Sequence, residues 1–556
     1  MSRPRTLIVG IDGATFDLLN PWIEAGELPH LSRFVERGAH ATLWAWPNTN
    51  SAAAWTSMVT GCNAGKHGVF DFGDMPPRVG RRWQPMTAAK RRREPFWCHL
   101  SDAGQSVGVI NVPISYPADR VRGFMVSGMD TPSVGSAGFT HPPELAEELR
   151  RRAYVIDIEN LGPLARQRPA RAAAALEDLV ARRVAATLHL MQTRDWDALM
   201  TVFVATDRAQ HHFWPRANAN AGSEGGGDGE ILLRIYRRID EFIGEAMKAA
   251  GDEALVIVVS DHGFGASRPG RKTLNQLFAE LGLLRFNEGR RRWGSSLRTG
   301  MLGYGRKLIP RNLQRPLAMR LARLRSRVVT ESRFTNIDWG RTRVFAGLHG
   351  SQVYVNLAGR QVDGTVAEEE KAELLRRVRE ILLDLTDPVS GARVVRSAAL
   401  SEEIYEGPQI GDAPDITVEW DFDAVGERIR YRAGGRDIVC AGPTAGAGVR
   451  WIGEHRPDGV FLAVGPMVRR AAISRVSLYD IAPTVLYAQG VPVPQEMDGR
   501  VLTEIFREDC QREHATVRQA AAAEASAHGR KPDGDRLRDD EAALIEERLR
   551  GLGYIE

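Results

Sequence analysis

Four short apolar runs constrain the fold of this chain more than any other feature of its sequence. They cover residues 6–12 (TLIVGID), 106–112 (SVGVINV), 198–207 (ALMTVFVATD) and 254–262 (ALVIVVSDH). Successive Val and Ile make both faces of each run apolar, which is typical of parallel strands covered by helices on both sides. Helical stretches separate the runs, for example at 169–190 and 230–250. We therefore predict an α/β fold, with a mostly parallel central sheet sandwiched by helices.

Three of these runs end in side chains that can bind a cation. Asp12, Asp207 and the pair Asp261 and His262 stand where the strands end. In open α/β sheets the ligand site lies beyond the carboxyl ends of the strands. A single Asp in this position is usually a helix cap or a turn residue. Three such ends together indicate a functional site at one edge of the sheet.

The composition of the chain limits the kinds of metal ligand that this site can offer. The 556 residues carry 74 Lys and Arg against 70 Asp and Glu, and 43% are hydrophobic, which is the balance of a soluble protein with a large core. Only 4 residues are Cys and none forms a CxxC pair, which excludes a disulfide scaffold and a thiolate zinc site. Any metal must therefore bind to His and carboxylate. The apolar run at the N-terminus is too short for a signal peptide or a membrane span, so we expect a cytoplasmic protein.

Two motifs supply such ligands. Asp207 and His211 form a D-x-x-x-H, which places both side chains on one side of a turn, and Asp261 and His262 are neighbours in the sequence SDHGF. A two-metal phosphoryl-transfer site needs about seven N or O ligands divided between two cations roughly 4 Å apart. Each motif alone is weak, because such spacings are common.

The segment 47–72 (PNTNSAAAWTSMVTGCNAGKHGVFDF) connects these motifs to a known family. It resembles the type I phosphodiesterase and nucleotide pyrophosphatase family of the alkaline phosphatase superfamily, in which a Ser or Thr nucleophile lies ten residues before the Gly of a T-G pair. That Gly is Gly61 here, so the resemblance implies that Ser51 is the nucleophile. A helix that begins at Ser51 would offer free N–H groups to a phosphoryl oxygen. Ser51 could equally be an N-cap.

The resemblance extends over most of the chain and implies a set of metal ligands. IDGATFD at 11–17, SDHGF at 260–264, GEHRPDGVFLAVGP at 453–466 and the segment 479–499 match the family's remaining motifs. One metal would be held by Asp207, His211 and His455, and the other by Asp12, Asp261, His262 and the Ser51 oxygen. The family usually binds zinc, with Mn²⁺ and Mg²⁺ as alternatives for these ligands. The resemblance implies hydrolysis in two steps through a phosphoseryl intermediate.

The chain departs from the family pattern at one position. Nucleotide pyrophosphatases carry an Asn 21 residues after the nucleophile that donates to a phosphoryl oxygen. The same count from Ser51 leads to Phe72, so the resemblance places Phe72 at the substrate without that donor. Asn48, Asn50 or Lys66 could supply the missing donor, although each is equally plausible as a turn or surface residue. This weakens the specific prediction of nucleotide pyrophosphatase activity but not that of phosphate-ester hydrolysis.

Other activities of related folds fit less well. Sulfatases need Pro two residues after the nucleophile and Arg four residues after it, whereas this chain has Ala53 and Trp55. A phosphotransferase of the cofactor-independent phosphoglycerate mutase type lacks support from any long insertion pattern. We therefore expect a phosphodiesterase or pyrophosphatase. A phosphomonoesterase or phosphotransferase is the alternative, and a membrane- or polyanion-binding protein with a vestigial site is a further one.

The spread of motifs predicts one catalytic domain over 1–510. Within it we expect a cap-like segment at 75–143 and a basic, partly helical insertion at 271–343, followed by a polar helical tail at 511–556. Residues 289–330 contain 12 Arg or Lys and no acid. This basic stretch could contact an anionic membrane or another polyanion, while its sparse aromatic residues do not suggest specific recognition of nucleic acid. We expect the substrate to be a phosphorylated small molecule or a lipid-like compound.

Overall fold

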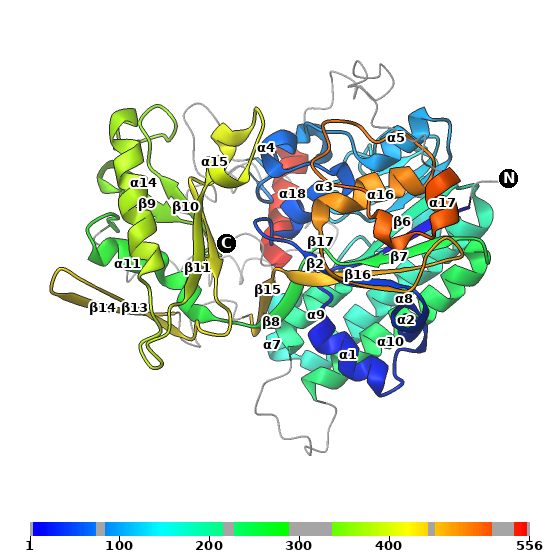
Figure 1. The fold of residues 1–556 in the computed structure, drawn as a ribbon, viewed down its shortest axis with the longest axis horizontal. Helices are drawn as coiled ribbons and strands as arrows, with labels where there is room; N and C mark the ends of the chain where they lie inside the picture. The colour runs from blue at the N-terminus through cyan, green and yellow to red at the C-terminus, as the bar shows by residue number, and fades with distance from the viewer. Residues whose placement is uncertain are drawn as a thin grey trace, which may run out of the picture.

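The structure is a computed structural model that describes residues 4–73, 84–158, 160–214, 227–287, 336–347, 349–442, 451–513 and 539–552. Figure 1 shows two lobes, a larger one built on a nine-stranded sheet and a smaller one built on a four-stranded sheet. None of the helices in these ranges is both long and apolar enough to cross a membrane.

The nine-stranded sheet of the large lobe has the order β17-β2-β16-β7-β1-β6-β3-β4-β5. Neighbouring strands are parallel except where β16 pairs with β2 and β7, and where β4 pairs with β5. The strands are β1 Thr6–Ile11, β2 Ala39–Trp44, β3 Val107–Ile110, β4 Gly123–Val126, β5 Thr140–His141, β6 Ala198–Phe203, β7 Leu255–Val259, β16 Asp458–Val464 and β17 Ala471–Ser477. The four apolar runs of the sequence are thus β1, β3, β6 and β7.

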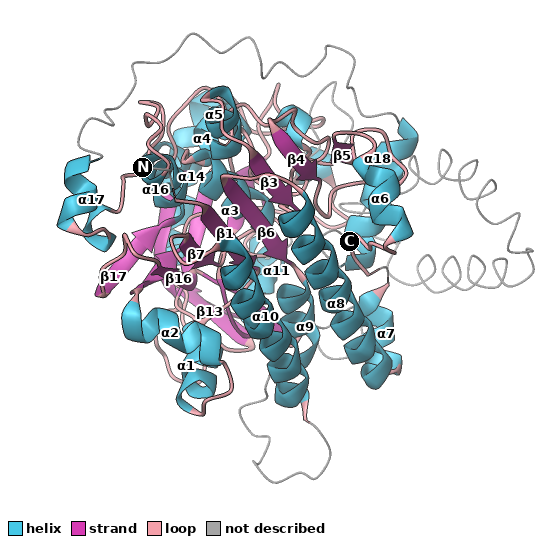
Figure 2. Ribbon diagram, turned by 90° about the vertical axis from the view of Figure 1, so that its right-hand side faces the viewer, coloured by secondary structure: helices cyan, strands magenta, loops and turns pink. Residues whose placement is uncertain are grey.

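Both faces of this sheet are buried, as continuous apolar strands require. In β1, Leu7 and Val9 belong to one apolar cluster and Ile8 to another, so alternate side chains point to opposite faces. Figure 2 shows the long helices α8 and α10 lying across one face. Helices whose residues join the first cluster are α1 Phe16–Glu24, α2 Pro29–Arg37, α6 Leu145–Arg151, α7 Leu161–Gln167, α8 Pro169–Thr193, α9 Ala205–Phe213 and α10 Asp228–Ala250. Those of the second are α3 Ser51–Thr60, α5 Phe96–Asp102 and α16 Ile481–Ala488.

The small lobe has its own apolar core. Its antiparallel sheet has the order β11-β12-β10-β9, and a separate hairpin joins β13 to β14. Helices α11 and α14 pack on this lobe. Its elements are α11 Leu274–Glu280, β9 Val344–Ala346, β10 Gln352–Val355, α14 Glu368–Leu383, β11 Val395–Leu400, α15 Ser401–Ile404, β12 Ile416–Trp420, β13 Arg428–Ala433 and β14 Arg436–Ala441. Short β8 Gly263–Ala266 and β15 Gly453–Arg456 pair at the junction of the lobes.

The remaining elements are short connections and the C-terminal helices. They are α4 Ala64–His67, the 3-10 helices η1 Ala88–Lys90, η2 Pro269–Thr273, η3 Trp339–Arg341, η4 Ile410–Asp412, η5 Leu478–Asp480 and η6 Thr503–Ile505, α17 Glu508–Glu513 and α18 Asp539–Leu552. Helix α18 lies against the large lobe, where Ile545 and Leu549 are fully buried beside Ala52 of α3. Helix α18 thus shares a buried apolar cluster with the residue that follows Ser51.

The α/β prediction, with a mostly parallel sheet covered by helices, is confirmed. The sequence also predicts a cap over 75–143, but within the described part of this range β3, β4 and β5 extend the central sheet. The apolar run of β3 explains this, because a strand with two apolar faces has to be buried. Of the predicted basic insertion, 271–287 and 336–343 include η2, α11 and η3, while the basic stretch 289–330 lies outside the described residues.

Candidate active site

The predicted metal ligands converge at the carboxyl edge of the central sheet. Asp12 follows β1, Asp207 and His211 lie on α9 just after β6, and Asp261 and His262 follow β7. His455 lies on β15. Within the described chain, β15 is the only one of the elements named here that is neither a parallel strand of the central sheet nor a crossover after one. The side chains form two groups of three, each with ligand atoms within 4.8 Å of one another. One group contains Asp207, His211 and His455, and the other contains Asp12, Asp261 and His262.

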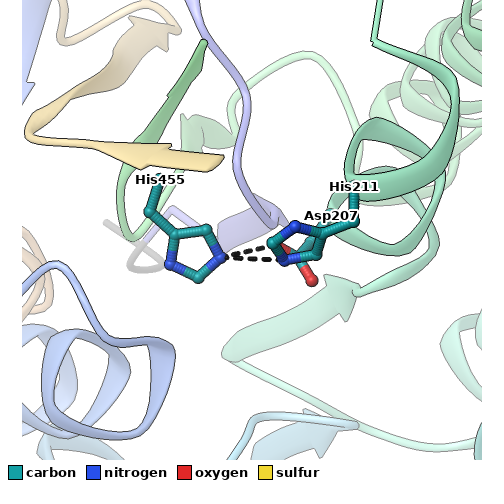
Figure 3. A group of neighbouring side chains, drawn as sticks. All are labelled: Asp207, His211 and His455. Atoms are coloured by element: carbon teal, nitrogen blue, oxygen red, sulfur yellow. Dashed lines mark hydrogen bonds and ion pairs between the residues drawn. The ribbon is translucent and has the colours of Figure 1, made fainter. Parts of the chain in front are cut away.

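The first group is compact, as Figure 3 shows. His455 Nε2 lies 3.0 Å from Asp207 Oδ1 and 3.2 Å from His211 Nε2, and His211 Nε2 lies 3.3 Å from Asp207 Oδ1. Ligand atoms bound to a tetrahedral zinc at about 2.0–2.1 Å lie roughly 3.3 Å from one another. The three atoms therefore have the spacing of ligands around one small cation.

The histidines are held in the orientation that a metal site requires. His211 Nδ1 donates to the Gly453 carbonyl at 3.0 Å, and His455 Nδ1 donates to the Thr49 carbonyl at 2.8 Å. His262 Nδ1 likewise donates to the carbonyl of Gly263 at 2.9 Å. A carbonyl only accepts, so the proton is on Nδ1 in each ring and the lone pair on Nε2 faces the site.

In the second group, two buried carboxylate oxygens have no hydrogen-bond partner in the described chain. These are Asp12 Oδ1 and Asp261 Oδ2, which lie 3.7 and 3.3 Å from His262 Nε2. Their other oxygens are occupied, since Asp12 Oδ2 accepts from Trp55 Nε1 at 3.0 Å and Asp261 Oδ1 from the Gly13 amide at 3.3 Å. Buried carboxylate oxygens are costly unless they are paired or bind a cation. The unpartnered oxygens therefore fit a second cation.

The pKa values of the three carboxyl groups also indicate that a cation fits the second group. Burial, together with the charges of Asp261 and Asp207, raises the pKa of Asp12 well above its usual value. Burial and the charge of Asp207 raise the pKa of Asp261 to about 8. Burial would also raise the pKa of Asp207, but the nearby His211 and His455 outweigh it and hold this pKa well below the ordinary range. Without a cation the second group retains protons that a divalent metal would displace.

The rings of His262 and His455 remain neutral in this environment. Burial and the neighbouring His455 lower the pKa of His262 to about 4, and burial also lowers the pKa of His455. The two rings stack with centroids 3.6 Å apart, so the two ligand groups are immediate neighbours. Two neighbouring ligand groups of this kind are what a two-metal site requires.

Ser51 lies beside the second group, at the first position of α3. Its Oγ is 3.1 Å from His262 Nε2, and the residue is completely buried. Asn50 caps the helix by accepting from the Ala52 amide at 2.9 Å. Ser51 is therefore not the N-cap, and its hydroxyl is available for another function. At the other end of α3, Gly61 adopts a left-handed conformation with φ 66°, which ends the helix.

Trp55 links α3 to a metal ligand. One turn after Ser51, its indole Nε1 donates to Asp12 Oδ2. The ring fits against β1 because position 10 is Gly, where an added Cβ would lie only 2.5 Å from the Trp55 ring. Gly10 and Trp55 thus fix Asp12 relative to Ser51.

Asp207 is held by a buried ion-pair network. Arg208 Nη1 donates to Asp207 Oδ2 at 2.8 Å, and Arg208 Nη2 donates to Asp157 Oδ2 at 3.0 Å. The other Asp207 oxygen faces His211 and His455. Arg208 therefore orients one carboxylate of the first group, as outer-shell partners of metal ligands do.

A cavity of about 60 Å³ adjoins the first group and lies between the lobes. It is large enough for several water molecules or a phosphoryl group. The large lobe contributes the loop 47–50 and residues 70–71, and the small lobe contributes residues 349, 351, 352 and 417. The remaining lining residues are His211, Arg271, Trp451, Glu454 and His455.

The four predicted substrate contacts lie in different places. Asn48 and Asn50 line the cavity, but Asn48 Nδ2 donates to Ser57 and Tyr479, and Asn50 Nδ2 donates to Asp71 at 3.0 Å. Both amides thus hold the loop together. Lys66 does not line the cavity and instead pairs with Asp498 and the Glu496 carbonyl. Phe72 is buried in an apolar cluster with α18.

Several residues of the site are not predicted by the sequence. Asp71 lines the cavity next to the position where the family pattern expects an amide. Trp55 and Arg208 could have been suspected, since one follows Ser51 by a helical turn and the other is adjacent to Asp207. Arg271 and Trp451 carry no local signal, because the packing of the small lobe brings them to the cavity.

Comparisons with known proteins agree with this arrangement. The family model for type I phosphodiesterase / nucleotide pyrophosphatase matches residues 6–425, which is most of the chain. No curated protein sequence gives a significant match. Among solved structures, phosphonoacetate hydrolase from Sinorhizobium meliloti 1021 in complex with phosphonoformate aligns with a TM-score of 0.50 at 14% identity, covering 88% of this chain and 96% of that one. Murine ectonucleotide pyrophosphatase / phosphodiesterase 5 aligns with a TM-score of 0.45 at 12% identity, covering 90% of this chain and 100% of the other.

At such low identity, the similarity to the hydrolase structure supports the fold alone. The family match extends from β1 into the small lobe and includes Asp12, Ser51, Asp207 and Asp261. The chain therefore belongs to the type I phosphodiesterase / nucleotide pyrophosphatase family, and it is a phosphoester hydrolase of that type.

Proposed function

We propose that this chain hydrolyses phosphodiesters or phosphoanhydrides with Ser51 as nucleophile and two divalent cations at the carboxyl edge of the sheet. One observation carries the proposal. Two groups of three ligands lie side by side, and Ser51 Oγ lies 3.1 Å from a ligand atom of the second group. Asp207, His211 and His455 would hold one cation, and Asp12, Asp261 and His262 would hold the other together with the Ser51 oxygen.

Bound cations would lower the pKa of the Ser51 hydroxyl and neutralise charge on the phosphoryl oxygens and the leaving oxygen. In the first step, Ser51 Oγ forms a bond to phosphorus as the bond to the leaving oxygen breaks. In the second step, water cleaves the phosphoseryl ester, releases the phosphoryl product and restores the Ser51 hydroxyl. The N-terminus of α3 supports both steps, because the helix dipole favours a negative phosphoryl oxygen.

Zinc is our proposal for both positions. The first group offers two imidazole nitrogens and one carboxylate, and the second offers one imidazole and two carboxylates. Imidazole favours zinc over hard cations, whereas the more carboxylate-rich second group also suits Mn²⁺ or Mg²⁺. Metal analysis of the purified protein distinguishes these cases.

The decisive test compares hydrolysis of bis-p-nitrophenyl phosphate and p-nitrophenyl phosphate by zinc-loaded and chelator-treated protein. We expect turnover of the diester to exceed that of the monoester and to disappear with chelator. Ser51→Ala should reduce kcat by roughly 10³-fold or more, since no second nucleophile replaces the hydroxyl. Two metal equivalents should remain bound to this variant.

Ser57→Ala is the matched control, because it removes a buried hydroxyl from the same helix. The Ser57 hydroxyl contacts His67 and Asn48 rather than the ligand groups. Undiminished turnover by Ser51→Ala, or no turnover of either ester by the zinc-loaded protein, would rule out the proposal. A preference for the monoester would favour the phosphomonoesterase alternative.

Contact of the basic stretch 289–330 with an anionic membrane stays a prediction.

A further inference from the structure

Residues of the first ligand group line the cavity and those of the second do not, and the position of the nucleophile defines which part of a substrate occupies it. Ser51 adjoins the second ligand group, whereas the cavity wall includes His211 and His455 of the first group. In an in-line displacement the attacking and leaving oxygens lie on opposite sides of phosphorus. If Ser51 attacks as proposed above, the leaving group points towards the first group and the wall beyond it. The assignment of this wall to the leaving group therefore rests on the proposed function.

Arg271 is the one Lys or Arg side chain that lines this cavity within the described residues. It lies on η2 and is 6% exposed. One terminal nitrogen, Nη2, donates to Glu454 Oε2 at 3.1 Å, while Nε has no hydrogen-bond partner in the described chain. A buried guanidinium donor without a partner is unfavourable unless a bound group accepts from it. The wall of the cavity thus contains a cationic donor that can bind an anion.

The need to neutralise the charge of Glu454 does not by itself explain why the Arg271 side chain is buried in the cavity wall. Glu454 is buried and also pairs with Lys272, and it accepts from the Arg268 amide. Lys272 alone would balance the charge of the Glu454 carboxylate. Arg271, Lys272 and Glu454 together carry one excess positive charge, and Lys272 does not line the cavity.

The surroundings hold Arg271 in place. Its guanidinium lies 4.7 Å from the centroid of the Phe422 ring. Gly350 packs on its backbone with φ 70°, and a Cβ at this glycine would lie 2.0 Å from the Arg271 carbonyl oxygen. Beside it, the Trp451 ring stacks on His211 with centroids 3.7 Å apart, which connects this wall directly to the first ligand group. A donor fixed in this way loses little conformational freedom when it binds an anion.

We propose that Arg271 binds a negatively charged group on the leaving side of the substrate. The enzyme then selects phosphoesters and anhydrides whose leaving group carries a carboxylate or a phosphate over those with a neutral leaving group. Arg271 is a specificity-determining residue in this proposal, and it takes no part in bond breaking.

Three substrates that share the phenylphosphonyl group test the proposal. The first is 4-nitrophenyl phenylphosphonate, whose leaving group lacks a fixed charge. The second is its 3-carboxy-4-nitrophenyl analogue, which adds a carboxylate. The third is the mixed anhydride of phenylphosphonate and phosphate, whose leaving group is phosphate. Each is assayed for kcat/KM with the zinc-loaded full chain, and binding of the two esters to the Ser51→Ala variant is measured by calorimetry.

Arg271→Met should lower kcat/KM for the two anionic leaving groups by about 10- to 100-fold, the usual effect of losing a hydrogen bond to a charged group. The neutral ester should change by less than about 3-fold. In the Ser51→Ala background, the same substitution should abolish the tighter binding of the carboxylated ester. A response of only one anionic substrate identifies the anion, carboxylate or phosphate, that the side chain binds.

Lys272→Met is the matched control, because it removes the same charge from the same ion cluster outside the cavity. It should leave the selectivity between the esters unchanged. The double variant Arg271→Met/Glu454→Gln restores the charge balance and should show the same loss of selectivity as Arg271→Met, with a normal melting temperature. Equal losses for neutral and anionic substrates, or equal effects of Lys272→Met, would refute the role of Arg271 while the proposed hydrolysis stands. If no substrate turns over but binding of the carboxylated ester still depends on Arg271, the hydrolytic proposal fails and the anion site is retained.

Discussion

At the scale of single residues, the site depends on groups that orient the ligands as much as on the ligands themselves. Each of the three histidines donates Nδ1–H to a backbone carbonyl, and two of the three carboxylates accept from a buried Trp or Arg side chain. Such partners fix the tautomer of a histidine and the rotation of a carboxylate before any cation arrives. The site is therefore preorganised for metal binding.

Trp55→Phe tests this preorganisation. The substitution keeps most of the ring in its place but removes the donor to Asp12 Oδ2. Loss of an outer-shell partner typically reduces metal affinity by about 10- to 100-fold. We expect a loss of this size for one of the two cations, measured by competition with a chelating dye. Trp97→Phe is the control, since its Nε1 donates to Asp119, which is outside both ligand groups. Equal metal affinities in the two variants would contradict the role of Trp55.

Sequence reasoning finds the residues of the two candidate ligand groups but not the side chains that orient them. Asp12, Asp207 and Asp261 are recognisable because each follows a continuous apolar run, and parallel strands bring their ends to one edge. Asn48 and Asn50 are reasonable candidates for substrate donors by residue type, yet their amides are used within the loop. The partner of a side-chain amide depends on packing between distant segments, such as Asn48 with Tyr479, and a single sequence does not contain that information.

At the scale of elements, α3 and α18 contribute side chains to one apolar cluster. All residues of α3 are buried, and Ala52 shares an apolar cluster with Ile545 and Leu549 of α18. The same cluster contains Met129, whose sulfur accepts from Arg208 Nη2 at 3.3 Å. Helix α18 therefore contacts the surroundings of both Ser51 and Asp207, although the sequence predicts it only as part of a polar tail.

Ile545→Asp should detach α18 from the large lobe, because a charged side chain is very costly in an apolar cluster. We expect faster amide hydrogen exchange in α18 and at Met129, and a lower kcat. Leu544→Asp is the matched control on the same helix, since Leu544 is 39% exposed and should tolerate the charge. If both variants exchange and turn over like the unmodified protein, α18 has no influence on the site.

At the scale of the whole molecule, the two candidate ligand groups join segments from residue 12 to residue 455. A ligand that binds only the folded state stabilises it by about 2.7 kcal/mol at a concentration 100 times its Kd. The cations should thus contribute to the stability of the entire large lobe.

The two lobes can be predicted from the sequence only in part. The central sheet is readable from its apolar runs, whereas the short strands of the small lobe lack a comparable signal.

The stability of the metal-free protein should fall as the pH rises from 7 to 8. In the folded state the pKa of Asp261 is raised from 3.8 to about 8 and the pKa of Asp12 is also raised, so the native protein binds more protons than the unfolded chain in this range. Each such carboxyl costs up to about 1.4 kcal/mol of unfolding free energy per pH unit. The pKa values of His67, His212, His262 and His349 are lowered from 6.5, so these rings oppose the trend only near pH 7, where about a quarter of each unfolded imidazole is protonated. Their contribution nearly vanishes by pH 8.

Thermal unfolding with chelator checks this prediction. The melting temperature should decrease between pH 7 and 8 without metal, and zinc should suppress the decrease because the cation replaces the protons. Asp261→Asn should flatten the pH dependence of the metal-free protein. A melting temperature that rises over this range in chelator would be the opposite result and would show that these carboxyls are already ionised in the folded state.

The position of β16 in the central sheet also affects how this protein is made. Strand β2, formed by Ala39–Trp44, is separated from β7 and β1 by β16, which is formed by Asp458–Val464. His455 precedes β16 by only a few residues. During synthesis on the ribosome, more than 400 residues are therefore added after β2 before its neighbour β16 has been made. The first ligand group is completed at nearly the same moment, so a growing chain cannot hydrolyse its substrate until almost the whole protein has been translated.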